Sequence, residues 1–176
     1  LGRNANPLSL GCDCLGVIHY FDGFVNDDHG NPVKLDQVIC MHEEDYGIQW
    51  KHTDLDGNPD VRRSRRLVIS YFATVGNYDY GFFWYFSHDG TIQHAVKLTG
   101  LVSTAALPPG QKSPYGQLLS PDGLYGPIHQ HFFNYRLDFD VDGPVNAVYE
   151  VHSAPEPLGP DNPHGNAFRS HAVLLE

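Results

Sequence analysis

The feature that most constrains the fold is the spacing of turn-forming clusters along the chain. Gly, Pro, Asn and Asp gather at residues 26–32, 54–59, 87–90 and 107–126. The segments between these clusters are short and rich in Val, Ile, Tyr and Phe, which is typical of β-strands. No window shows a sustained amphipathic helical pattern. The sequence therefore predicts an all-β fold, an antiparallel β-sandwich with long Pro/Gly-rich loops and little helix.

Several strands can be placed individually. The segment Leu67–Val75 is nearly all apolar, which predicts a strand buried on both faces. Residues 82–86 and 91–99 flank the turn-forming residues 87–90 and predict a β-hairpin. From about Pro144 onward Pro and Gly become frequent again, which predicts a long loop or arm with only Ala172–Leu175 as a strand.

Charge and hydropathy exclude some partners. The formal net charge of −10 argues against nucleic acid, whose phosphates require a basic surface. The one dense basic run is interpreted as a solvated or salt-bridged turn: Arg62, Arg63, Arg65 and Arg66. No apolar run approaches the roughly 20 residues needed to cross a bilayer. No targeting signal is visible and the sequence begins at Leu1, so the compartment is left open.

Two histidines stand at alternate positions in a strand-like segment, His129–Val141. Alternate side chains of a strand share one face, and this face would hold His129, His131, Phe133, Tyr135, Leu137, Phe139 and Val141. Two imidazoles on one buried face can bind one copper, zinc, iron or nickel ion. The alternative is a pair of hydrogen-bonded core histidines, and spacing does not identify a third ligand among His152, His164 and His171.

A polar segment, Thr74–Gly81, interrupts two apolar strands. Within it Tyr78 lies between Asn77 and Asp79, and Gly76 and Gly81 permit close backbone approach. On physical grounds alone, such a tyrosine is a packing residue with its hydroxyl group hydrogen-bonded.

The motif Asn77-Tyr78-Asp79-Tyr80 resembles the cofactor signature of the copper-containing, topaquinone-dependent primary amine oxidases. Further segments resemble that family in the same order along the chain: residues 11–16, 39–45, 62–66, 90–92, 129–131 and 165–168. The resemblance covers essentially the whole chain. It implies that residues 1–176 are a partial catalytic domain, the central part of a large antiparallel β-sandwich.

The resemblance also implies roles for individual residues. It makes Tyr78 the tyrosine that is oxidised in place to topaquinone and forms a Schiff base with the amine, and it makes Asn77 the neighbour that restrains the ring. His129 and His131 match two of three copper ligands. Cys14 and Cys40 match an intrachain disulfide, which leaves Cys12 free.

A second cation site is implied at the end of the same segment. Asp138 and Asp140, with the carbonyl of Phe139 between them, match part of a peripheral site for calcium or a similar ion. Carboxylate and carbonyl oxygens suit such a hard cation. The alternative is a solvated acidic strand end.

The implied activity is oxidative deamination of primary amines by dioxygen to aldehyde, ammonia and hydrogen peroxide, in a homodimer. The resemblance puts the general-base Asp upstream of residue 11 and the third copper His beyond Glu176. Two alternatives stay open: a truncated, catalytically inactive product, or a metal-binding β-sandwich module without quinone chemistry. The sequence does not indicate which amine is the substrate.

Overall fold

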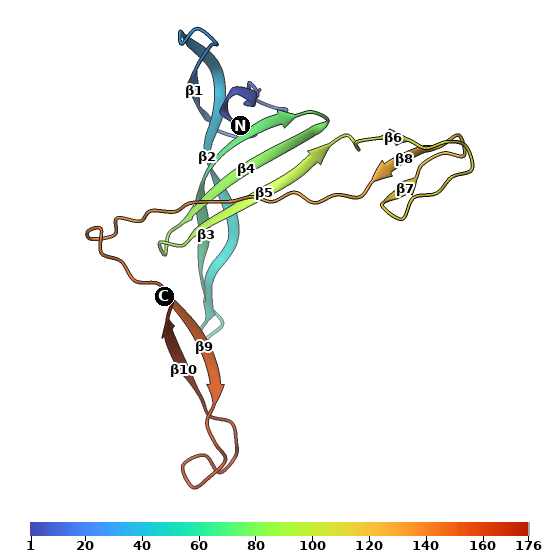
Figure 1. Ribbon diagram of the computed structural model, residues 1–176. Helices are drawn as coiled ribbons and strands as arrows, with labels where there is room; N and C mark the ends of the chain where they lie inside the picture. The colour runs from blue at the N-terminus through green and yellow to red at the C-terminus, as the bar shows by residue number, and fades with distance from the viewer. Residues whose placement is uncertain (176) are drawn as a thin grey trace. The chain divides into compact units, whose positions relative to one another are not determined.

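The computed structural model describes residues 1–175, and its regular secondary structure is almost entirely antiparallel strands (Figure 1). One 3₁₀ turn, Gly2–Asn4, precedes ten strands. Their bounds are β1 His19–Asn26, β2 Pro32–Thr53, β3 Pro59–Val75, β4 Tyr78–Ser87, β5 Ile92–Gly100, β6 Ala105–Ala106, β7 Gly116–Leu118, β8 Leu124–Pro127, β9 Tyr149–Pro155 and β10 Phe168–Leu174. The predicted all-β, antiparallel class is confirmed. Within the described residues no helix is long and apolar enough to cross a membrane.

The chain divides into two compact units. The first unit, Leu1–His129, contains a five-stranded sheet in the order β1-β2-β3-β4-β5 and a three-stranded sheet in the order β6-β8-β7. The second unit, from Gln130 onward, contains the two-stranded sheet of β9 and β10. Each strand of the five-stranded sheet pairs with its neighbour in sequence, as the ribbon in Figure 1 shows. Short-range pairing of this kind follows from the tight turns between the strands.

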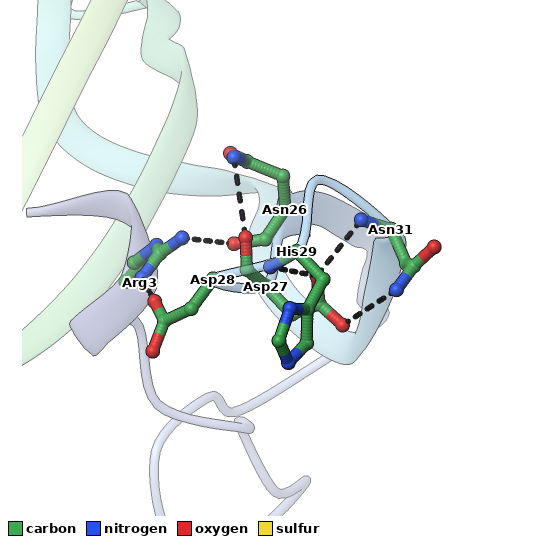
Figure 2. A network of polar contacts seen from close by, with 6 residues as sticks. All are labelled: Arg3, Asn26, Asp27, Asp28, His29 and Asn31. Atoms are coloured by element: carbon green, nitrogen blue, oxygen red, sulfur yellow. Dashed lines mark hydrogen bonds and ion pairs between the residues drawn. The ribbon is translucent and has the colours of Figure 1, made fainter.

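The turns at residues 26–32 and 53–59 share one sequence pattern and one hydrogen-bond pattern. Asp27 Oδ1 accepts the backbone N–H of His29 (2.9 Å) and of Asn31 (2.8 Å), and Asp27 Oδ2 accepts the side-chain amide of Asn31 (3.0 Å; Figure 2). Asp54 makes the corresponding bonds with the backbone and side chain of Asn58, at 2.8 and 3.0 Å. Hydrogen bonds from the asparagine lower the pKa of each carboxyl group. Both turns are therefore closed by an Asx motif.

The core of the first unit lies on the inner strands of its large sheet. The most enclosed apolar residues of these strands are Val38, Cys40, Val68, Ala73, Tyr80, Phe82 and Tyr85. The prediction for Leu67–Val75 holds only in part, because Leu67 and Val75 at its ends are 39% and 38% exposed. The predicted hairpin of residues 82–99 is confirmed, with β4 and β5 paired throughout.

The basic run lies within β3 rather than in a turn, and it is salt-bridged as predicted. Its arginines pair with acids of β2 and β3: Arg62 with Asp60, Arg63 with Asp45, Arg65 with Glu43 and Arg66 with Glu44. Arg66 is the most enclosed of the four, and its guanidinium lies over the ring of Tyr85, 3.8 Å from the centroid. The run therefore ties β2 to β3.

Two predictions about the second half of the chain were wrong. Residues 128–140 form no strand, and all of them are exposed, so the predicted buried face from His129 to Leu137 is absent. Alternation of polar and apolar residues predicts which face of a strand is buried only if a partner strand is present. No described strand pairs with this segment. The Pro-rich region contains β9 in addition to the expected final strand, because Tyr149–Pro155 pairs in register with Phe168–Leu174.

Candidate functional site

Tyr78 is the first residue of β4, directly after a two-residue turn made by Gly76 and Asn77. Gly76 has a φ of +62°, which suits the first central position of a tight hairpin turn. The close backbone approach predicted at Gly76 is absent, since a Cβ there would meet nothing within 4 Å. Glycine is needed there for the backbone angle of the turn. At Gly81 the predicted close approach is confirmed, because a Cβ would lie 2.7 Å from the rings of Phe72 and Phe83. The Tyr78 side chain is partly buried.

Gly100 lies opposite Tyr78 across the β4–β5 pair, and the sequence analysis missed it. Its φ is +106°, and a Cβ there would lie 2.4 Å from the carbonyl oxygen of Asn77 and 2.9 Å from the Cα of Tyr78. The next residue, Leu101, donates its N–H to that same carbonyl (2.7 Å). Only glycine suits both the backbone angle and the space. Gly100 thus fixes the backbone of Asn77 and Tyr78.

The hydroxyl of Tyr78 is hydrogen-bonded to Nε2 of His129 at 2.7 Å, and the two ring centroids are 5.5 Å apart. His129 follows β8 by two residues, and its Nδ1 lies 2.9 Å from the carbonyl oxygen of Pro127. A carbonyl oxygen only accepts, so Nδ1 carries the proton and Nε2 presents its lone pair to the phenol. A neutral imidazole held in this tautomer is the metal-ligating form, with Nε2 as the ligating atom.

A short polar chain lies beside the turn before Tyr78. Thr74 accepts a hydrogen bond from the side-chain amide of Asn6 (2.9 Å) and donates its hydroxyl to Asp79. Thr74 and Asp79 face each other across the β3–β4 pair. These bonds connect residues on both sides of Tyr78 and so restrict its position. No local sequence signal predicts that Asn6 bonds Thr74, because the two residues are 68 positions apart.

The other predicted ligands lie in the second unit. His131, Asp138, Phe139 and Asp140 are exposed. The Phe139 carbonyl accepts a hydrogen bond from the side-chain amide of Asn146 (2.7 Å). No three His, Cys, Asp or Glu residues among residues 1–175 gather in a group that could hold a metal ion. The copper pair and the peripheral cation site stay predictions, and the structure brings His129 to Tyr78.

The two cysteines of the expected disulfide lie in the same part of the first unit. Cys14 and Cys40 are both buried in one apolar cluster with Leu8, yet all three cysteines are free thiols in the structure. Burial, with a further contribution from Cys14, raises the pKa of the Cys40 thiol to about 12. The disulfide implied by the resemblance stays a prediction, and its two residues lie together in this cluster. Cys12 is exposed.

Residues 1–176 match the family described as copper amine oxidase, enzyme domain. The chain belongs to the copper amine oxidase family. A primary amine oxidase of Arthrobacter sp. (strain P1) is 56% identical over 178 residues, which cover 100% of this chain and 27% of that protein. A histamine oxidase of Arthrobacter globiformis is 54% identical over 176 residues, which cover 99% of this chain and 25% of that protein.

Solved structures give the same result. The crystal structure of a copper-containing benzylamine oxidase from Hansenula polymorpha matches 99% of this chain with a TM-score of 0.86 and 34% identity, over 28% of its own length. This copper amine oxidase chain thus spans about a quarter of the length of the relatives it matches.

Proposed function

We propose that this chain provides the cofactor tyrosine and two copper ligands of a primary amine oxidase. In this proposal Tyr78 is the topaquinone precursor, and His129 and His131 bind copper. The reaction is the oxidative deamination of a primary amine by dioxygen to an aldehyde, ammonia and hydrogen peroxide. The observation that supports it best is the 2.7 Å contact between the Tyr78 hydroxyl and Nε2 of His129.

The residues present fit copper by the chemistry of their donor atoms. Because Nδ1 of His129 is bound to the Pro127 carbonyl, the lone pair of the imidazole is on Nε2, where it faces the Tyr78 hydroxyl. Imidazole nitrogen is a preferred ligand of copper. The phenol oxygen of Tyr78 lies where that lone pair points. A cation accepted by Nε2 would therefore adjoin the ring that is to be modified. His131 would supply the second imidazole.

Copper, when bound, supplies dioxygen activation, and topaquinone supplies the electrophilic carbonyl and the electron sink that amine oxidation requires. The chain's own residues hold the reacting ring in place. Gly100 and the Asn77 carbonyl fix the backbone at Tyr78, and Asn77 is proposed to restrain the ring. Thr74 and Asp79 close the turn from the opposite side. Positioning of this kind lowers the entropic part of the barrier.

The proposal also covers the rest of the enzyme and a second cation site. The general base and the third copper ligand would come from other parts of the polypeptide, and the active form would be a homodimer. Asp138, Phe139 and Asp140 would contribute to a peripheral calcium-type site, for which the Phe139 carbonyl would exchange its bond with Asn146 for one with the cation.

The test is a chimera in which this chain replaces the matching 178 residues of the Arthrobacter primary amine oxidase. The chimera should release hydrogen peroxide and ammonia from a panel of primary amines, and His129→Ala should abolish both products. The alternative of a metal-binding module predicts copper uptake with no amine oxidation. A chimera that binds copper and folds, yet turns over no primary amine, would refute the proposed function. The isolated chain should bind copper only weakly, because two imidazoles leave coordination positions to water.

A further inference from the structure

The first unit contains three thiols, Cys12, Cys14 and Cys40, and they differ in their access to solvent. Cys40 is completely buried and Cys14 is 7% exposed, and both belong to one apolar cluster. Cys12 is exposed and precedes Cys14 by two residues in a tight turn. The turn is closed by the N–H of Gly11, which donates to the carbonyl of Cys14 (2.8 Å).

An imidazole adjoins the buried pair. Nδ1 of His42 lies 3.5 Å from Sγ of Cys40, and His42 itself is only partly buried. It therefore contacts the enclosed thiol and is itself accessible to solvent. Cys40 needs such a partner, because a thiol whose pKa is raised to about 12 by burial gives almost no thiolate at neutral pH. Burial of both residues limits the reaction of this pair with solutes in water.

We propose that Cys12 is the solvent-accessible thiol through which hydrogen peroxide oxidises the buried Cys14/Cys40 pair, with His42 accepting the proton that Cys40 releases. This inference goes beyond the proposed amine chemistry and does not depend on it.

Peroxide oxidises the Cys12 thiol to a sulfenic acid and leaves as water. The Cys14 thiol displaces a second water and forms a Cys12–Cys14 disulfide. Cys40 then attacks the Cys14 sulfur, its proton moves to His42, and the Cys12 sulfur leaves and is reprotonated. The sum is two thiols and one peroxide giving a Cys14–Cys40 disulfide and two waters, with Cys12 regenerated.

The experiment follows disulfide formation in the chain after reduction with dithiothreitol and removal of the reductant. Hydrogen peroxide is added, samples are quenched by alkylation in acid, and peptide mass spectrometry measures each disulfide. Cys12→Ser should slow formation of the Cys14–Cys40 disulfide by about tenfold or more while leaving the same end product. Cys40→Ser should accumulate the Cys12–Cys14 disulfide instead.

His42→Ala should also slow the second exchange, so that the Cys12–Cys14 disulfide becomes detectable, and added imidazole should restore part of the rate. His29→Ala, which changes a histidine in the exposed β1–β2 turn, is the matched control and should react like the unchanged chain. Circular dichroism verifies that each variant is folded. A Cys12→Ser variant that forms the buried disulfide at the original rate would overturn the proposal, and so would a folded Cys40→Ser variant without a Cys12–Cys14 disulfide.

Discussion

The two compact units of the chain differ in how far they bury their own strands. In the first unit, Val68 on β3 and Cys40 on β2 are almost inaccessible to solvent. In the second unit, every residue of β10 is exposed, and β9 has only one partly buried residue, Ala154. Tyr78 and His129 belong to the first unit, whereas His131 lies on an exposed segment of the second. One half of the proposed copper pair thus lies in the unit with the buried strands, where it contacts Tyr78, and the other half lies in the unit with the exposed strands.

The largest expected effect concerns the backbone at Tyr78, in the unit with the buried strands. Gly100→Ala should destabilise the first unit by about 3 kcal/mol or more, because it adds strain at positive φ and a clash with the backbone of Asn77 and Tyr78. Chemical denaturation measures the loss, and quinone formation in the chimera should fall with it. Gly90→Ala is the control: its φ is +84°, but a Cβ there meets nothing within 4 Å, so it should cost only about 1 kcal/mol. Equal effects of the two variants would contradict the role given to Gly100.

A matched pair of valines compares the cores of the two units. Val68→Ala should cost about 2 kcal/mol, because it removes buried methyl groups and leaves a cavity beneath the sheet. Val151→Ala on β9, where the side chain is 66% exposed, should change stability by less than about 0.5 kcal/mol. Urea unfolding of both variants measures the difference. A larger loss for Val151→Ala would show that β9 and β10 are buried against something in solution.

The smallest expected effect is on acid stability. Hydrogen bonds from Arg63 lower the pKa of Asp45 below its ordinary value of 3.8. A lowered folded pKa stabilises the fold fully above the unfolded value, and this contribution disappears as the pH falls below 3.8 through the folded pKa. Asp45→Asn should therefore flatten the acid side of a plot of unfolding midpoint against pH. The change is small because both side chains are about half exposed.

The Asp45 effect has an internal control. Arg63→Gln should flatten the same part of the plot, and the double variant should do no more than either single one. Additive effects would mean that the two residues act independently of their salt bridge.

The sequence predicted those parts of the fold that depend on neighbouring residues. The β4–β5 hairpin follows from a turn signal, Ser87–Gly90, set between two strand-forming runs. The strand predicted for His129–Val141 is absent, because alternation of polar and apolar residues does not reveal whether a partner strand exists. The salt-bridged arginines were expected, but their place within β3 was not, since it depends on pairing with acids of β2.

The candidate site was predictable to a similar extent. Tyr78 and His129 came from short motifs, and the structure brings them into contact across 51 residues of sequence. Gly100 and Asn6 gave no local signal, because strand pairing and a side-chain bond over 68 residues determine what they do. The sequence motif placed Cys14 and Cys40 together, which the structure shows, but their oxidation state does not follow from the sequence.

The most direct test of the account is the identity of the residue that becomes the quinone. The chimera and its Tyr78→Phe variant are purified without metal and then given copper in air. Quinone-directed staining and peptide mass spectrometry locate the product. The account predicts a quinone on the peptide that contains Tyr78, and no quinone in Tyr78→Phe even though that variant still binds copper. A stained Tyr78→Phe protein, or a copper-loaded chimera with an unmodified Tyr78, would contradict it.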